Sequence, residues 1–224
     1  RKYKSSPAIL NKELSLVLKA LNHLPCRTGE MVRLALFASR IAQNPHAFDE
    51  STEMGRLLLY GISFFLKKDY PNSAENRLEV YYHAGLIKDE ISNYTLCSGL
   101  TGYQNGQVHP GWSGFAERGE SLHVSLLNLS RLDRVKSPSG RVFVFENPTV
   151  FTEVLENTAA KCPSLICTYG QIKVASYILM DFLAGENTTI YYSGDFDPEG
   201  LLIADRLKER YCDKLIFWRY SRKD

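Results

Sequence analysis

The 224-residue sequence has few of the features that mark membrane or secreted proteins. Its longest apolar stretches, such as residues 57–66, fall well short of the roughly 18 residues that a membrane span requires. No apolar signal core with a small-residue cleavage site follows Arg1. We therefore expect a cytoplasmic protein without membrane segments. Because the sequence does not begin with methionine, we also expect a fragment or a processed chain.

The sequence also has little that could form a disulfide framework or a structural zinc site. Its five cysteines are odd in number, and no two of them have the CxxC spacing. Paired cysteines at fixed spacing are typical of both kinds of site. Their scatter favours a reducing compartment, which agrees with a cytoplasmic location.

A strong net charge is absent as well. The formal net charge is +2, and the hydrophobic (44%) and charged (23%) fractions are typical of soluble globular domains. Any affinity for DNA must therefore come from a local basic patch. Candidate phosphate-binding residues are Arg206 and Arg219, in a C-terminal stretch that also contains Lys208, Arg210, Lys214, Arg222 and Lys223. The competing interpretation is that these charges only solvate a helix face.

The N-terminal part shows helical periodicity. Apolar residues lie on one helical face in residues 7–22 and 28–44, residues 54–66 are apolar nearly all round, and residues 74–84 are typical of another short helix. We therefore predict a mainly helical region over residues 1–97, as a fragment of a larger N-terminal domain. Residues 98–120 contain six glycines and no sustained apolar period, which predicts a glycine-rich loop or linker at a domain boundary.

From residue 121 to 224 the pattern changes to alternating strands and helices. The predicted strands are 122–129, 141–145, 164–167, 188–192 and 214–218, and the predicted helices are 149–160, 171–183 and 200–211. Such alternation predicts an α/β fold in which a mostly parallel sheet is flanked by helices.

Two acidic motifs follow predicted strands of this domain. The first strand ends at Glu146, and a later one ends in a pair of aspartates, Asp195 and Asp197. In open parallel sheets, ligand sites lie at the carboxyl ends of the strands. Clustered carboxylates repel one another unless a cation binds them, and oxygen ligands suit Mg²⁺ or Mn²⁺. We therefore predict a divalent-metal site formed by these three residues.

Each candidate also has a structural interpretation. Asp197 before Pro198 is typical of a helix N-cap, and Glu146 could stand at an ordinary strand-to-helix junction. The joint occurrence of the two motifs favours metal binding. Thr168 and Gln171 join a predicted strand to a helix, where they could hold a phosphate or form a plain capped turn.

The acidic motifs resemble the Toprim fold, which topoisomerases, primases and several nucleases share. The sequence GDFDPEG is especially similar to the A subunit of type VI topoisomerases. The resemblance extends over most of the chain to the Toprim-containing D component (JetD-like) of Wadjet anti-plasmid defence systems. It rests on the motifs NPHAFDESTEMGRLLL, AGLIKDEISNYTLCSGL, VFVFENPTVF, CTYGQ and YSGDFDPEGLLIA, in this order.

This resemblance implies a metal-dependent DNA nuclease that works in a condensin-like complex. Glu146 corresponds to the Toprim glutamate, and Asp195 and Asp197 correspond to its metal-binding aspartates. The expected reaction is hydrolysis by water on one or two Mg²⁺ ions, with Glu146 as a ligand or, alternatively, as a general base. The competing functions are a catalytically quiet DNA-binding scaffold and, with less support, a topoisomerase or primase. Nicking or double-strand cleavage, DNA preference and oligomeric state, a homodimer included, stay open.

Overall fold

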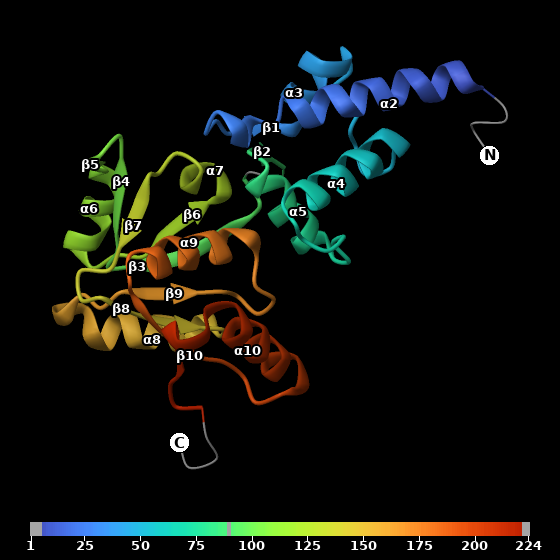
Figure 1. The fold of residues 1–224 in the computed structure, drawn as a ribbon. Helices are drawn as coiled ribbons and strands as arrows, with labels where there is room; N and C mark the ends of the chain where they lie inside the picture. The colour runs from blue at the N-terminus through green and yellow to red at the C-terminus, as the bar shows by residue number, and fades with distance from the viewer. Residues whose placement is uncertain (1–5, 89–90, 221–224) are drawn as a thin grey trace. The chain divides into compact units, whose positions relative to one another are not determined.

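The computed structural model describes residues 6–88 and 91–220 of the chain, which divides into two compact units, residues 1–90 and 91–224. The first unit is mainly helical, and the second contains a six-stranded, mostly parallel sheet (Figure 1). This architecture confirms the predicted α/β class and the predicted helical N-terminal region. Within the described ranges, no helix is long and apolar enough to cross a membrane.

In the described residues 6–88, the first unit contains four α-helices and a short parallel strand pair. Its elements are α2 (Pro7–Asn22), η1 (Pro25–Arg27), β1 (Val32–Arg33), α3 (Leu34–Ala42), α4 (Glu53–Phe65), α5 (Ala74–His83) and β2 (Leu86–Ile87). Helices α4 and α5 begin where polar side chains cap them, because Thr52 accepts a hydrogen bond from the Gly55 amide and Ser73 accepts one from the Asn76 amide. Such caps satisfy amides that have no partner within the helix.

The second predicted helix starts later than expected. The prediction began it at residue 28, whereas α3 begins at Leu34. Thr28 donates both its amide and its hydroxyl to the Pro25 carbonyl, and Val32 then pairs with β2. The prediction was wrong because a tertiary strand pairing uses the residues that the apolar spacing assigned to the helix.

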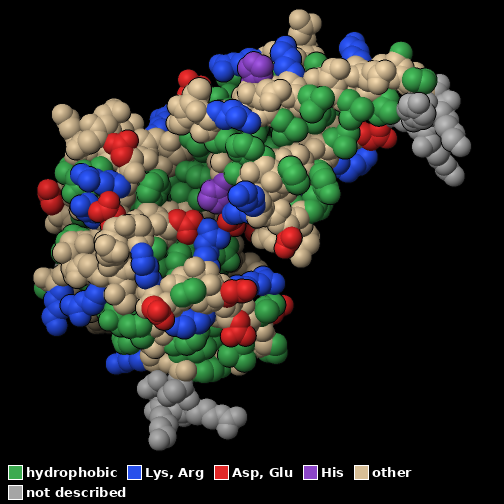
Figure 2. Space-filling model, viewed as in Figure 1, with side chains coloured by type: hydrophobic (Ala, Val, Ile, Leu, Met, Phe, Trp, Pro, Cys, Tyr) green, Lys and Arg blue, Asp and Glu red, His purple; other side chains and the backbone are tan. Residues whose placement is uncertain are grey.

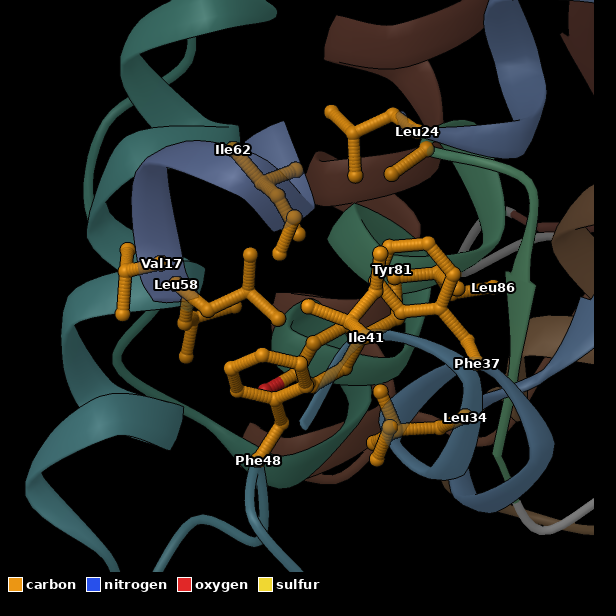
Figure 3. Close-up of a cluster of buried hydrophobic side chains, with 14 of the residues drawn as sticks. Val17, Leu24, Leu34, Phe37, Ile41, Phe48, Leu58, Ile62, Tyr81 and Leu86 are labelled. Atoms are coloured by element: carbon orange, nitrogen blue, oxygen red, sulfur yellow. The ribbon is translucent and has the colours of Figure 1, made fainter. Parts of the chain in front are cut away.

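A hydrophobic core holds these helices together. Figure 3 shows buried side chains from α2, α3, α4 and α5 pointing toward one another, with Phe48 and Tyr81 both at 0% exposure. On the face seen in Figure 2, further hydrophobic side chains lie over α2 and α4. The core follows from the three-to-four spacing, which places the apolar residues of each helix on one side.

An ion-pair cluster ties the segment before α4 to the end of the first unit. Glu50 accepts hydrogen bonds from Lys88 Nζ at 2.6 Å and from Arg77 Nε at 3.1 Å. Partial burial alone would raise the pKa of Glu50, but the bond to Lys88 and the charges of Lys88 and Arg77 outweigh it and lower the pKa. The ionised form of Glu50 therefore stabilises the folded state.

Replacing Glu50 by glutamine should lower the free energy of unfolding near neutral pH by up to about 1 kcal/mol, as for a partly exposed ion pair. Because folding lowers this pKa, the stabilisation is present above the unfolded value of 4.5 and is lost as pH falls through the folded value. Urea unfolding of the wild type and of Glu50→Gln should show that their difference in the free energy of unfolding shrinks as pH falls toward about 3. Glu30→Gln, at an exposed position, is the control. A difference independent of pH would contradict this assignment.

The second unit is built on a sheet with strand order β11-β10-β8-β9-β3-β6. Its strands are β3 (Tyr94–Ser98), β6 (Leu122–Ser125), β8 (Arg141–Phe145), β9 (Leu165–Cys167), β10 (Thr189–Ser193) and β11 (Leu215–Phe217). The last four in chain order are mutually parallel, and β3 is antiparallel to both of its neighbours. Strand β8 has the predicted bounds. The predicted strand 122–129 is divided into β6 and the short helix α7 (Leu126–Leu129).

Helices cover both faces of this sheet: α8 (Pro148–Thr158), α9 (Val174–Gly185) and α10 (Pro198–Tyr211). Leu96 of β3 packs in one core cluster with Phe151 of α8. The preceding residue of β3, Thr95, accepts a hydrogen bond from Ser176 of α9. Because neighbouring residues of a strand point to opposite faces, α8 and α9 lie on opposite faces. Helix α10 lies beside α9, since Tyr211 donates its hydroxyl to Asp181 (Figure 1).

Residues 98–120 are not the loop that their glycines predicted. They contain β4 (Thr101–Gln104), β5 (Gln107–Val108) and α6 (Pro110–Arg118), and β4 also pairs with β7 (Arg134–Lys136). The glycines have specific places in this structure. Gly106 lies in the hairpin turn with φ +74°, Gly102 lies against the Trp112 ring, and Gly119 ends α6 with φ +67°. The compact units divide at residue 90, ahead of the predicted boundary.

Candidate functional site

Glu146 and Asp195 follow two neighbouring parallel strands, β8 and β10. The chain leaves β8 into α8 on one face of the sheet and leaves β10 into α10 on the other face. Adjacent strands whose connections leave in opposite directions form a topological switch point, which is where open α/β sheets bind ligands. The two acidic motifs therefore follow the strand pair at which open α/β sheets usually bind ligands.

The carboxylate of Glu146 is held in place by two donors. Its Oε2 atom accepts hydrogen bonds from the Tyr192 hydroxyl and from the Asp195 amide, both at 3.2 Å. Strand alternation explains the first bond, because Glu146 lies on the same face as Val144, which is paired with Tyr192. Glu146 is 9% exposed, so this carboxylate is largely withdrawn from water.

Tyr192 is fully buried beneath the Glu146 carboxylate. Burial, reinforced by the negative charge of Glu146, raises the pKa of the Tyr192 phenol. The hydroxyl therefore stays protonated and donates to the carboxylate at any physiological pH. Tyr192 was not among the predicted site residues, because a tyrosine within an apolar strand has no distinguishing signal in the sequence.

Two glycines let the Asp195 loop pack closely. A Cβ atom at Gly194 would overlap the Tyr192 hydroxyl and lie 2.8 Å from Glu146 Oε2. A Cβ atom at Gly200 would overlap the Asp195 carbonyl oxygen. The glycines that flank the aspartate pair therefore fit the loop against Glu146 and against the first turn of α10.

Asp197 is the N-cap of helix α10. Its Oδ1 atom accepts a hydrogen bond from the Gly200 amide at 2.7 Å, and Pro198 begins the helix. The structure therefore confirms the alternative interpretation of Asp197 as a helix N-cap. One carboxylate oxygen is used in the cap, and Oδ2 is not needed for it.

Substitutions of Asp197 distinguish its role as a helix cap from a role as a metal ligand. Asp197→Ala should lower the free energy of unfolding by about 0.5–2 kcal/mol, whereas Asp197→Asn should leave it nearly unchanged, because asparagine caps equally well. Thermal unfolding measures both effects. If Asp197 is also a ligand, the asparagine variant should lose metal-dependent activity without losing stability. If Asp197→Asn keeps full activity, Asp197 acts only as the helix cap.

The donor set at this edge consists of carboxylate oxygens. Asp195 and Asp197 are exposed, and within residues 6–88 and 91–220 no lysine or arginine forms an ion pair with Glu146, Asp195 or Asp197. Over the same ranges, no group of three or more His, Cys, Asp or Glu side chains is arranged to hold a metal ion. Mg²⁺ is usually bound by one or two carboxylates together with substrate phosphates and waters, so this oxygen set fits that ion in its chemistry.

The predicted phosphate-binding turn lies at the end of the neighbouring strand β9. Thr168 is buried and donates both its amide and its hydroxyl to the Phe145 carbonyl. The Gly170 amide donates to the Glu146 carbonyl, and Gln171 is exposed ahead of α9. These bonds occupy the Thr168 donors and tie β9 to the Glu146 segment, so they favour the plain turn for Thr168.

The predicted basic residues divide into two groups. Three of them are bonded within the fold: Lys208 to the carbonyls of Cys212 and Leu215, Arg210 to Asp181, and Lys214 to the Ala184 carbonyl. Arg206 and Arg219 are exposed, and the Arg219 guanidinium lies 5.1 Å from the centre of the Trp218 ring. Arg222 and Lys223 lie outside the described residues.

Arg219 follows β11 and therefore lies at the same edge of the sheet as Asp195. On the face of residues 91–220 seen in Figure 2, basic and acidic side chains are interspersed. A local contact to phosphate at this edge thus fits the structure better than a broad basic face.

Two domain families match the chain. The family described as "Protein of unknown function C-terminus (DUF2399)" matches residues 122–224, which include every candidate site residue. The family described as "Protein of unknown function N-terminus (DUF3323)" matches residues 1–102. No curated protein matches the chain. The two matches cover different parts of one polypeptide, so the chain is similar to the DUF3323 family over residues 1–102 and to the DUF2399 family over residues 122–224.

Proposed function

We propose that this protein is a metal-dependent DNA nuclease of a plasmid-defence system. One observation carries the proposal: Glu146 and Asp195 lie at the ends of adjacent parallel strands, at the topological switch point, and are joined by a hydrogen bond. The pair of matched domains supports it, since this pair occurs in JetD-like D subunits of Wadjet systems. A cytoplasmic location and a condensin-like partner complex belong to the same proposal.

In this proposal the protein side chains position the reacting groups. Tyr192 and the Asp195 amide hold the Glu146 carboxylate through Oε2, which leaves Oε1 for a metal ion. The exposed Asp195 carboxylate supplies a second oxygen ligand, and Asp197 could supply a third through Oδ2. Because Glu146 is held on one side by two donors, we favour a ligand role over a general-base role. A bound divalent cation would polarise the scissile phosphate and lower the pKa of the attacking water.

Incubation of supercoiled plasmid with the full chain tests this function. We expect conversion to open-circular or linear DNA with Mg²⁺ or Mn²⁺ and intact plasmid with EDTA. The same reactions should be repeated with the partner complex, because a D subunit acts within it. Intact plasmid in every metal, with and without the partners, would refute catalysis.

A catalytically quiet DNA-binding scaffold is the second candidate function. One observation favours it: the part of the chain that the structure describes has no acidic cluster of three side chains arranged around a metal position. Such a scaffold would bind DNA with an affinity that does not change when the metal is removed. A gel-shift titration in Mg²⁺ and in EDTA distinguishes the two candidates.

A further inference from the structure

Three aromatic rings are stacked beside the Asp195 loop. The Tyr220 ring lies between Phe196 and Phe217, with ring centres 4.6 Å and 5.4 Å apart and interplanar angles of 21° and 25°. We call these three residues the aromatic shelf. Phe196 comes from the loop after β10, whereas the other two come from the end of β11 and the segment after it.

The shelf is fixed to the candidate site by a hydrogen bond. The Tyr220 hydroxyl donates to the Asp195 carbonyl at 3.1 Å. The nearby Trp218 side chain, by contrast, packs against Phe143 and Phe145 in the core. The stack is therefore attached to the backbone of a candidate ligand and is separate from the core cluster.

The outer part of the shelf is open to solvent. Phe196 is 60% exposed and Phe217 is 39% exposed. Exposed, stacked aromatic rings are what single-stranded nucleic-acid binding proteins use, because every base has a flat face that stacks on them. The exposed Arg219, which directly precedes Tyr220, adds a cation for a phosphate.

We propose that the aromatic shelf stacks an unpaired nucleobase next to the carboxylates of Asp195 and Glu146. This inference rests on the proposed function, because it takes DNA as the ligand, and it adds that the site takes a single-stranded or locally unpaired segment. An apolar protein segment fits the shelf less well, since its docking would remove water from the exposed Asp195 and Asp197 carboxylates.

The test is binding of fluorescein-labelled oligothymidylate and of a duplex of equal length, measured by fluorescence anisotropy with the full chain in EDTA. Phe196→Ala should weaken single-strand binding about 5- to 150-fold, as expected for loss of one base–aromatic stack, and should change duplex binding less than twofold. Phe196→Trp should restore the affinity, and Phe196→Leu should not. Phe64→Ala, at another exposed phenylalanine, is the matched control and should have no effect.

Three results would overturn the inference: no single-strand binding by the wild type, unchanged affinity of Phe196→Ala, or full rescue by leucine. The second of these would be the result expected if the shelf contacts a protein. Because the assay needs no cleavage, it is independent of the nuclease test. If Phe196→Ala weakens single-strand binding but the wild type never cuts DNA, only catalysis is refuted. If the wild type cuts DNA but Phe196→Ala binds single strands normally, only the aromatic shelf is refuted.

Discussion

Asp195→Asn should lower metal-dependent plasmid cleavage by more than about 100-fold, because even the outer-shell partners of a metal ligand contribute about 10- to 100-fold. The substitution keeps the shape of the side chain and removes the charge that would bind the cation. Glu146→Gln should have an effect of the same size. Its amide oxygen can still accept from Tyr192 and from the Asp195 amide, so the loop should keep its conformation. Agarose gels of supercoiled plasmid over a time course measure the rates.

Asp205→Asn is the matched control for charge. Asp205 is exposed on α10, so its substitution removes one negative charge from the same unit without touching the strand ends. We expect cleavage within about twofold of the wild type. Cleavage by Asp195→Asn at the wild-type rate would remove Asp195 from the site. An equal loss in all three variants would point to a general electrostatic effect instead.

Gly200→Ala should destabilise the second unit by about 1–3 kcal/mol, the range for inserting an extra methyl group into a packed region. Helix propensity alone predicts the opposite sign, because alanine is favoured over glycine within a helix by about 1 kcal/mol. The added Cβ atom would overlap the Asp195 carbonyl oxygen, which is backbone and cannot rotate away. The Asp195 loop must therefore shift, so cleavage should fall together with stability. Chemical denaturation followed by circular dichroism measures the stability.

Gly185→Ala provides the matched comparison. Gly185 is the last residue of α9, and a Cβ atom there would meet nothing within 4 Å. This variant should be as stable as the wild type or up to about 1 kcal/mol more stable, because only the backbone preference changes. If Gly200→Ala and Gly185→Ala changed stability in the same direction, the close approach of Gly200 to Asp195 would not explain the need for glycine at position 200.

The helical periodicity of residues 7–22 and the apolar run of residues 141–145 predicted α2 and β8 with the bounds that the structure has. Both patterns are local, since the spacing of apolar side chains along one element reflects which side it buries. The α/β class followed from the same kind of information. Residues 98–120 were misassigned because glycine in a hairpin turn, below a tryptophan ring and at a helix end looks the same in sequence as glycine in a loop.

The sequence by itself determined which residues end the strands, and so it identified Glu146, Asp195 and Asp197 as candidates. Only the tertiary structure decided that β8 and β10 are neighbours, which brings Glu146 to the Asp195 amide and onto the Tyr192 hydroxyl. It also decided that Phe196 stacks with Tyr220 and Phe217, which come from a later segment of the chain. The physical reason is that strand order and ring stacking depend on contacts between segments far apart in the chain, which local periodicity does not encode.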